Sequence, residues 1–332
     1  MLSASVALAA SACGSAGFGA PVDVPGCLTF ADLYALTGPE SEGFDNWADA
    51  QPLATELGST TQLPDGPLSI TAPGEESGTY GSYVEIVVEP IAEMRAAAGH
   101  LAEDQVSMTR KDYNPSADDN VIIDSIAGTE GSLGWVGFAY ADANRDLVQS
   151  LAIDGGKGCV EPTEETIAEL DYPISRPLFI YVDVGAARGH PAVAAFVSYY
   201  VRDEGRTFAE AGGYISLTEQ DWAETQAKWA GLGIDPPADA VDGSVTISGS
   251  STVEPVTALA AEQFNAEQSG VAISVAGPGT SDGFAQFCAG QIPVADASRA
   301  IAEEETAQCE DAGIDFVELQ IGIDGLSVIT RK

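Results

Sequence analysis

The sequence predicts an α/β protein built from two domains, and three observations support this. Segments in which apolar and polar residues alternate, as in a strand, are interspersed along the chain with segments of helical periodicity. The chain has 332 residues, of which 45% are hydrophobic, and this is enough apolar material for two packed cores. Residues 231–243 are rich in Gly, Pro and Asp and lack periodicity, so they predict a linker between two structured blocks.

Four elements are predicted before the linker. Residues 68–71 form a short strand, and residues 80–98 carry the pattern of a helix. Residues 133–140 and 178–184 are almost wholly apolar, as buried strands are. Strand and helix therefore alternate in this block.

The block after the linker repeats the alternation. Residues 244–248 predict a strand, and Val256 to Phe264 place mostly apolar residues on one face of a helix. Residues 271–276 and 325–330 predict two further strands.

The charge balance and the spacing of reactive residues exclude several function classes. Thirteen Lys and Arg against 51 Asp and Glu give a net charge of −38, so nucleic acid and anionic membranes are poor partners. No run of eighteen apolar residues is present that could span a membrane. The two histidines and five cysteines lack the spacing of a zinc site, and no nucleophile motif such as G-x-S-x-G occurs. We therefore expect no metal, no cofactor and no enzymatic activity.

Residues 1–19 predict export. A short run of small and apolar residues leads to Cys13, and a Gly- and Ser-rich stretch follows, as at the end of a bacterial lipoprotein signal. In this interpretation Cys13 is lipidated and the rest is a tether; the alternative is a disordered leader with an incidental cysteine.

The other cysteines predict two disulfides. Four remain, an even number, which in an exported chain favours pairing. The simpler connectivity is Cys27 with Cys159 and Cys288 with Cys309, the latter pair being 21 residues apart; four buried thiols are the alternative.

Three loops that follow predicted strands share one design. Residues 247–255, 277–283 and 72–79 are each rich in Ser, Thr and Gly, and each precedes a predicted helix. Ser251 and Glu254 have the spacing of a capping box. A helix start offers unpaired N–H groups and about +0.5 of a charge, so three that converge would hold a tetrahedral oxyanion. Each loop alone is an ordinary helix cap.

Longer motifs carry a resemblance to the phosphate-binding proteins of bacterial phosphate ABC transporters. After the linker these motifs are ISGSSTV (247–253), GPGTSDGF (277–284), FCAGQI (287–292), ADASRAI (295–301) and IDGLSV (323–328). Before it they are CLTFADL (27–33), PGEESGTY (73–80), DDNVI (118–122), GSLGWVGFAYA (131–141) and GKGCVEPT (156–163). The resemblance implies a two-lobed type II periplasmic binding protein fold with the ligand cleft between the lobes.

The two blocks stand in the reverse of the family's usual order, so the resemblance implies a circularly permuted chain. The old ends would be joined by residues 231–243, leaving one lobe at 20–172 and the other at 173–332. Only the segment 172–177 would then cross between the lobes. An artefact of gene assembly remains the alternative.

The resemblance also implies a set of phosphate ligands. Where many relatives have an arginine this chain has Pro73, and we expect Arg110 to replace it. Asp296, or alternatively Asp282, would accept the proton of hydrogen phosphate, because the family's usual aspartate is absent. The remaining ligands expected are Thr252, the backbone of Val253, Thr280, Ser298, Arg299, Ser77, Gly78 and Thr79.

The function that follows is extracytoplasmic capture of inorganic phosphate by a monomer that delivers it to an ABC permease. The alternatives are a binding protein for another oxyanion, such as sulfate or a phosphonate, and a phosphate-sensing surface protein that is not coupled to transport.

Overall fold

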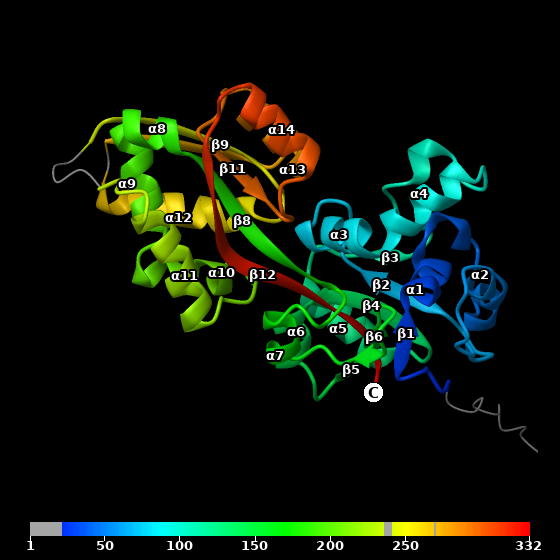
Figure 1. The fold of residues 1–332 in the computed structure, drawn as a ribbon. Helices are drawn as coiled ribbons and strands as arrows, with labels where there is room; N and C mark the ends of the chain where they lie inside the picture. Colours follow the sequence, from blue (N-terminus) through cyan, green and yellow to red (C-terminus); the bar gives the residue numbers. More distant parts are fainter. Residues whose placement is uncertain (1–21, 236–240, 269) are drawn as a thin grey trace, which may run out of the picture.

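The computed structural model describes residues 22–235, 241–268 and 270–332, which form two α/β lobes joined by long strands (Figure 1). The predicted two-lobed α/β fold is confirmed. The leader 1–19, including Cys13, lies outside the described residues. Within the described part of the chain, no helix has the length and apolar character needed to span a membrane.

One sheet runs through both lobes in the strand order β10-β9-β11-β8-β12-β4-β2-β3, with β5 paired to β12. A smaller sheet has the order β1-β6-β7. The strands of the large sheet are β2 (Ser69–Ala72), β3 (Asn114–Pro115), β4 (Ser132–Gly137), β5 (Val148–Ser150), β8 (Ser175–Asp183), β9 (Gly243–Gly249), β10 (Val271–Ala276), β11 (Val294–Ala297) and β12 (Phe316–Arg331). Those of the small sheet are β1 (Cys27–Thr29), β6 (Ala152–Asp154) and β7 (Cys159–Val160).

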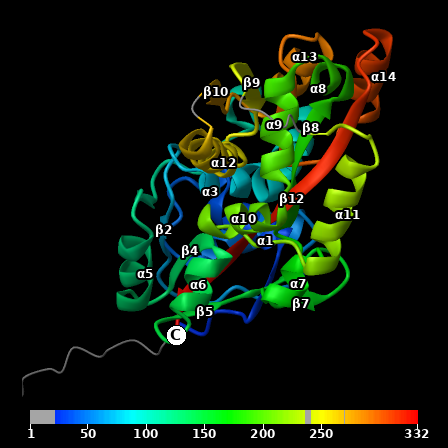
Figure 2. The ribbon, with the colours of Figure 1, turned by 90° about the vertical axis from the view of Figure 1, so that its left-hand side faces the viewer.

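Strand β12 passes through both lobes, which corrects the expectation of a single crossing at 172–177. Residues 316–325 of β12 pair antiparallel with β8, and residues 326–330 pair antiparallel with β4 (Figure 2). The end of the chain therefore pairs with strands from 20–172, although the predicted lobe 173–332 includes it. The sequence pattern indicated only 325–330 as a strand, because the residues before it do not alternate regularly.

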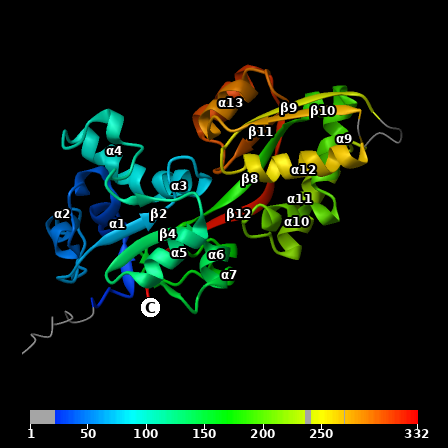
Figure 3. The same cartoon turned by 180° about the vertical axis from the view of Figure 1, so that it is seen from behind.

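In the lobe that contains β9, helices cover both faces of the sheet (Figure 3). Phe196 of α9 and Phe264 of α12 pack edge to face, with 5.7 Å between ring centroids, in one core. Phe284 of α13 packs on Tyr181 of β8 in a second core. The helices here are α8 (Val184–Gly189), α9 (Pro191–Tyr200), α10 (Thr207–Ala211), α11 (Glu219–Ala230), α12 (Glu254–Glu267), α13 (Thr280–Cys288) and α14 (Glu303–Asp311), with a 3₁₀ turn at Asp203–Arg206.

In the other lobe, Tyr83 stacks on Trp135 of β4 with 3.9 Å between ring centroids, inside a large buried cluster. The predicted helix 80–98 is present as α3 (Gly78–Tyr83), a π-helical segment (Val84–Val88) and α4 (Glu89–Ala97). The predicted strand 133–140 ends at Gly137, because α6 begins at Phe138. The remaining helices are α1 (Phe30–Thr37), α2 (Gln51–Glu56), α5 (Asp119–Gly128), α6 (Phe138–Ala143) and α7 (Glu164–Ala168), with 3₁₀ turns at Pro39–Ser41, Trp47–Ala50 and Glu103–Gln105.

Both predicted disulfides are present. Cys27–Cys159 links β1 to β7 in the small sheet, and Cys288–Cys309 links α13 to α14. The predicted linker falls between the end of α11 at Ala230 and the start of β9 at Gly243, and its residues 236–240 lie outside the described part.

Candidate ligand-binding site

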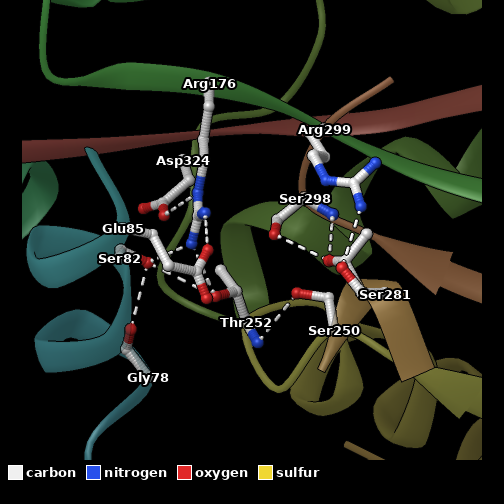
Figure 4. A network of polar contacts seen from close by, with 11 residues as sticks. Gly78, Ser82, Glu85, Arg176, Ser250, Thr252, Ser281, Ser298, Arg299 and Asp324 are labelled. Atoms are coloured by element: carbon white, nitrogen blue, oxygen red, sulfur yellow. Dashed lines mark hydrogen bonds and ion pairs between the residues drawn. The ribbon is translucent and has the colours of Figure 1, made fainter. Parts of the chain in front are cut away.

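Arg176, near the start of β8, lies at the junction of the lobes and contacts both of them (Figure 4). Its Nη2 donates to the Ser82 hydroxyl of α3 at 2.7 Å and to the Thr252 hydroxyl before α12 at 2.9 Å. The two hydroxyl oxygens are themselves 3.3 Å apart. One guanidinium group therefore bridges two hydroxyl acceptors that lie 170 residues apart in the sequence.

Two carboxylates neutralise Arg176. Its Nε donates to Asp324 of β12 at 3.3 Å, and its Nη1 donates to Glu85 of the π-helical segment. The Asp324 side chain is 3% exposed, whereas that of Glu85 is 48% exposed. A buried guanidinium is stable only with such partners, so the pair with Asp324 is a fixed part of the junction.

The loop before α12 is held against β11. Gly249 has φ +152°, and a Cβ atom there would lie 2.0 Å from the carbonyl oxygen of Asp296, so the close approach requires glycine. The N–H of Ser250 donates to that same carbonyl at 2.8 Å. This turn presents Thr252 to the junction.

The predicted capping box at this loop is wrong. The cap residue of α12 is Val253, which makes no side-chain cap, and the helix begins at Glu254. Instead, the hydroxyl of Ser250 accepts from the N–H of Thr252 at 3.2 Å. The N–H of Val253 donates to the carbonyl of Ser250 at 3.2 Å, so this expected ligand donor is engaged in the turn.

The start of α3 meets the start of α12. Ser77 caps α3 by accepting from the N–H of Thr79 at 3.2 Å. A Cβ atom on Gly78 would lie 3.8 Å from Cα of Thr252, which shows how closely the two backbones approach. The Gly78 carbonyl accepts from Ser82 at 3.0 Å and thereby orients the hydroxyl that contacts Arg176.

The third loop, before α13, joins the same cluster. The N–H of Gly279 donates to the carbonyl of Gly249 at 2.8 Å, which ties this loop to the one before α12. The Thr280 hydroxyl lies 3.1 Å from the Ser298 hydroxyl and accepts from the Ser298 N–H at 3.3 Å. The three predicted helix starts therefore lie around one junction.

A cavity of about 520 Å³ opens beside this junction. It is lined by Glu85, Ile86, Glu89, Arg176, Pro278, Gly279, Thr280, Ser281, Asp282, Ser298 and Arg299. Thr79 instead lines a separate cavity of about 270 Å³, which it shares with Tyr214 and Asp324. Of the expected ligands, Thr280, Ser298 and Arg299 thus face the larger cavity, as does the alternative acceptor Asp282.

Arg299 is engaged by a neighbouring carboxylate. Its Nη1 and Nη2 each donate to Glu305 at 2.8 Å, and Nη2 also donates to Ser281 at 3.0 Å. The paired carboxylate raises the pKa of Arg299 further above its already high value. Glu305 is therefore the bidentate acceptor of Arg299, and a ligand would have to bind Arg299 together with Glu305 or displace Glu305.

The side chains of Arg110 and Asp296, two of the expected ligands, lie away from the junction. Arg110 is buried, where it donates to Asp112 at 2.6 Å and to the Phe44 carbonyl at 2.8 Å. Asp296 is fully buried under α12, where its Oδ1 accepts from Thr257 at 2.8 Å. Burial raises the pKa of Asp296 to about 7, because the charged form loses its hydration. The structure does not bring either side chain to the junction.

Sequence reasoning missed Arg176, Asp324, Ser82 and Glu85. One signal could have found the first of them, since Arg176 stands inside the predicted crossing segment 172–177, where a cleft between lobes is expected. No feature of the neighbouring sequence marks Asp324, Ser82 or Glu85 as partners of Arg176.

Comparison with known proteins adds the following. A family model described as a PBP superfamily domain matches residues 30–204 and 235–332. Protein SphX of Synechocystis is 31% identical over 195 residues, which are 58% of this chain and 51% of SphX. The phosphate-binding protein PstS of Staphylococcus saprophyticus is 26% identical over 184 residues, 55% of this chain and 49% of PstS. This chain thus spans about half the length of the curated relatives it matches.

A solved structure shares the fold. It is the phosphate-binding protein of a phosphate ABC transporter from Streptococcus pneumoniae, which superposes with a TM-score of 0.58 at 18% identity, covering 80% of this chain and 90% of that one.

Proposed function

Because the chain belongs to the PBP (periplasmic binding protein) superfamily, we propose that it binds inorganic phosphate between its two lobes. The observation that carries the proposal is the convergence on Arg176 of hydroxyl groups from both lobes, Ser82 and Thr252, beside a cavity that Arg176 itself lines. The relative PstS is named a phosphate-binding protein, and this supports the choice of phosphate.

The chemistry of the junction suits a tetrahedral oxyanion. Arg176 supplies a planar set of donors, and Thr252, Thr280 and Ser298 supply hydroxyl groups. The helix starts add backbone N–H groups and partial positive charge. Arg176 takes the role that we expected of Arg110, and so supplies the cation that is missing at Pro73.

The overall charge of −38 does not oppose this proposal. Salt screens exposed charges beyond about 8 Å, whereas donors in direct contact with the anion are screened much less. Two carboxylates on the cavity wall, Glu89 and Asp282, favour hydrogen phosphate over sulfate, because only the former carries a proton that a carboxylate can accept.

The wider biology is part of the same proposal. The protein would be exported, anchored through lipid on Cys13, monomeric, and would deliver phosphate to the membrane subunits of an ABC permease. The lobes would correspond to 20–172 and 173–332 in a circularly permuted chain joined by 231–243, except that the end of β12 pairs with strands of the first lobe. The order of the quoted motifs along the sequence supports the permutation. The proposed activity is binding, without catalysis and without a cofactor.

Titration calorimetry of the full chain with phosphate, arsenate and sulfate tests the proposal. We expect saturable binding of phosphate and arsenate, and much weaker binding of sulfate. Absence of phosphate binding would refute the function, and tighter binding of sulfate than of phosphate would favour the alternative of another oxyanion. Capture of purified permease subunits by the phosphate-loaded protein separates transport from sensing.

A further inference from the structure

We propose that Glu85 is an internal competitor of the ligand: its carboxylate occupies the side of Arg176 that an incoming anion needs, and it leaves when the anion binds. This inference rests on the proposed function. It assigns to Glu85 a role in setting the affinity of the site, and it predicts that the site binds all divalent oxyanions more weakly than its donors would allow.

The geometry of Arg176 leaves one side for the ligand. Nε is taken by Asp324, and Nη2 is taken by the hydroxyls of Ser82 and Thr252. Nη1 donates to Glu85. Arg176 and Glu85 both line the 520 Å³ cavity, whereas Asp324 lines the separate cavity of about 270 Å³. An anion that enters from the larger cavity therefore meets Arg176 on the side that Glu85 covers.

The two carboxylates differ in their freedom to leave. The Asp324 side chain is 3% exposed, so its departure from Arg176 would leave a buried charge without a partner. The Glu85 side chain is 48% exposed and can rotate into water, where its carboxylate is hydrated. Asp324 is thus the permanent counter-ion of Arg176, and Glu85 is the exchangeable one.

Electrostatic repulsion favours replacement of Glu85 by the anion over binding of both to Arg176. Cavity-lining Glu89 and Asp282 already place negative charge on the wall. If Glu85 stayed on Arg176 while a doubly charged anion bound to the same guanidinium, its carboxylate would repel that anion at short range. Replacing Glu85 by the anion keeps one acceptor on Nη1 and removes that repulsion.

The test is calorimetry of Glu85→Gln with phosphate and with sulfate. Glutamine keeps the size of the side chain but removes the charge, so we expect the Kd for both anions to fall about 1.5- to 5-fold, which is the fold-change that an exposed ion pair is worth. Glu93→Gln is the matched control, because Glu93 is an exposed residue of α4 in the same helical stretch and does not line the cavity. We expect it to leave both Kd values unchanged.

Each result decides the matter. An unchanged or higher Kd for both anions in Glu85→Gln overturns the inference while the wild type still binds phosphate. Weaker phosphate binding together with tighter sulfate binding also overturns it, since Glu85 would then accept the ligand proton. If neither wild type nor variant binds phosphate, the proposed function itself fails and the inference falls with it. A second variant, Glu85→Ala, must show the same direction as Glu85→Gln, and thermal unfolding verifies that both fold.

Discussion

Removal of Arg176 should destabilise the protein chiefly through the carboxylate that it leaves behind. In Arg176→Ala, Asp324 keeps its place in β12 with a side chain that is 3% exposed and without its cationic partner. Breaking a buried ion pair from one side costs about 3–5 kcal/mol. Ser82 and Thr252 add little to the loss, because their hydroxyls are already 3.3 Å apart and can bond to each other. We expect the free energy of unfolding to fall by about 3 kcal/mol, at the lower end of the range.

A double-mutant cycle separates this cost from the loss of packing. Urea unfolding of the oxidised protein, followed by tryptophan fluorescence, gives the free energy of unfolding of wild type, Arg176→Ala, Asp324→Asn and the double variant. Asparagine has the size of aspartate but no charge, so the double variant should recover about 2 kcal/mol relative to Arg176→Ala.

A destabilisation below about 1 kcal/mol in Arg176→Ala would contradict this reasoning, because it is the size typical of an exposed pair. An additive cycle would contradict it as well, since the two residues would then not interact.

Three further predictions concern the site, a buried acid and a disulfide. Thr252→Val should raise the Kd for phosphate about 10- to 150-fold in calorimetry, because hydrogen bonds to charged groups are worth about 1.5–3 kcal/mol; an unchanged Kd would remove Thr252 from the site. Burial raises the pKa of Asp296 from 3.8 to about 7, so the folded state holds the proton more tightly than the unfolded chain. Stability should therefore decline as pH rises from about 4 to about 7. Asp296→Asn should flatten the decline in urea unfolding at pH 5 and 7, and an equal slope in the variant would exclude Asp296 as its cause. Replacing both Cys288 and Cys309 by Ser removes a link between residues 21 apart, so the free energy of unfolding in urea should fall by about 3 kcal/mol. An unchanged free energy of unfolding would show that this disulfide does not restrict the unfolded chain.

The sequence predicts most of the elements that surround the site. The alternation of apolar and polar residues in 244–248 and 271–276 matches β9 and β10. Successive side chains of a strand point to opposite faces, so a strand with one buried face has an apolar residue at every second position. The pairing of Cys288 with Cys309 follows from their nearness in the chain. The loops at 247–255, 277–283 and 72–79 are recognisable because Gly, Ser and Thr have local reasons to precede helices.

Local rules mislead where a distant partner intervenes. Ser251 and Glu254 have the right spacing for a capping box, yet backbone contacts between the loop and Asp296 fix a different turn. Strand β12 extends to residue 316 because β8 and β4 are both available to pair with it along its length. The pattern of apolar and polar residues within β12 does not reveal that β8 and β4 pair with it.

By itself, then, the sequence determined the α/β class, the two disulfides, the helix starts rich in hydroxyl groups, and the net charge of −38. Tertiary structure alone decided which cation those helix starts surround. Arg110 and Arg176 are equivalent as residue types, but the first is enclosed by Asp112 and backbone carbonyls, while the second lies between lobes. The physical reason is that helix starts and strand alternation depend on neighbours in the chain, whereas the environment of a charge depends on groups that only folding brings near it.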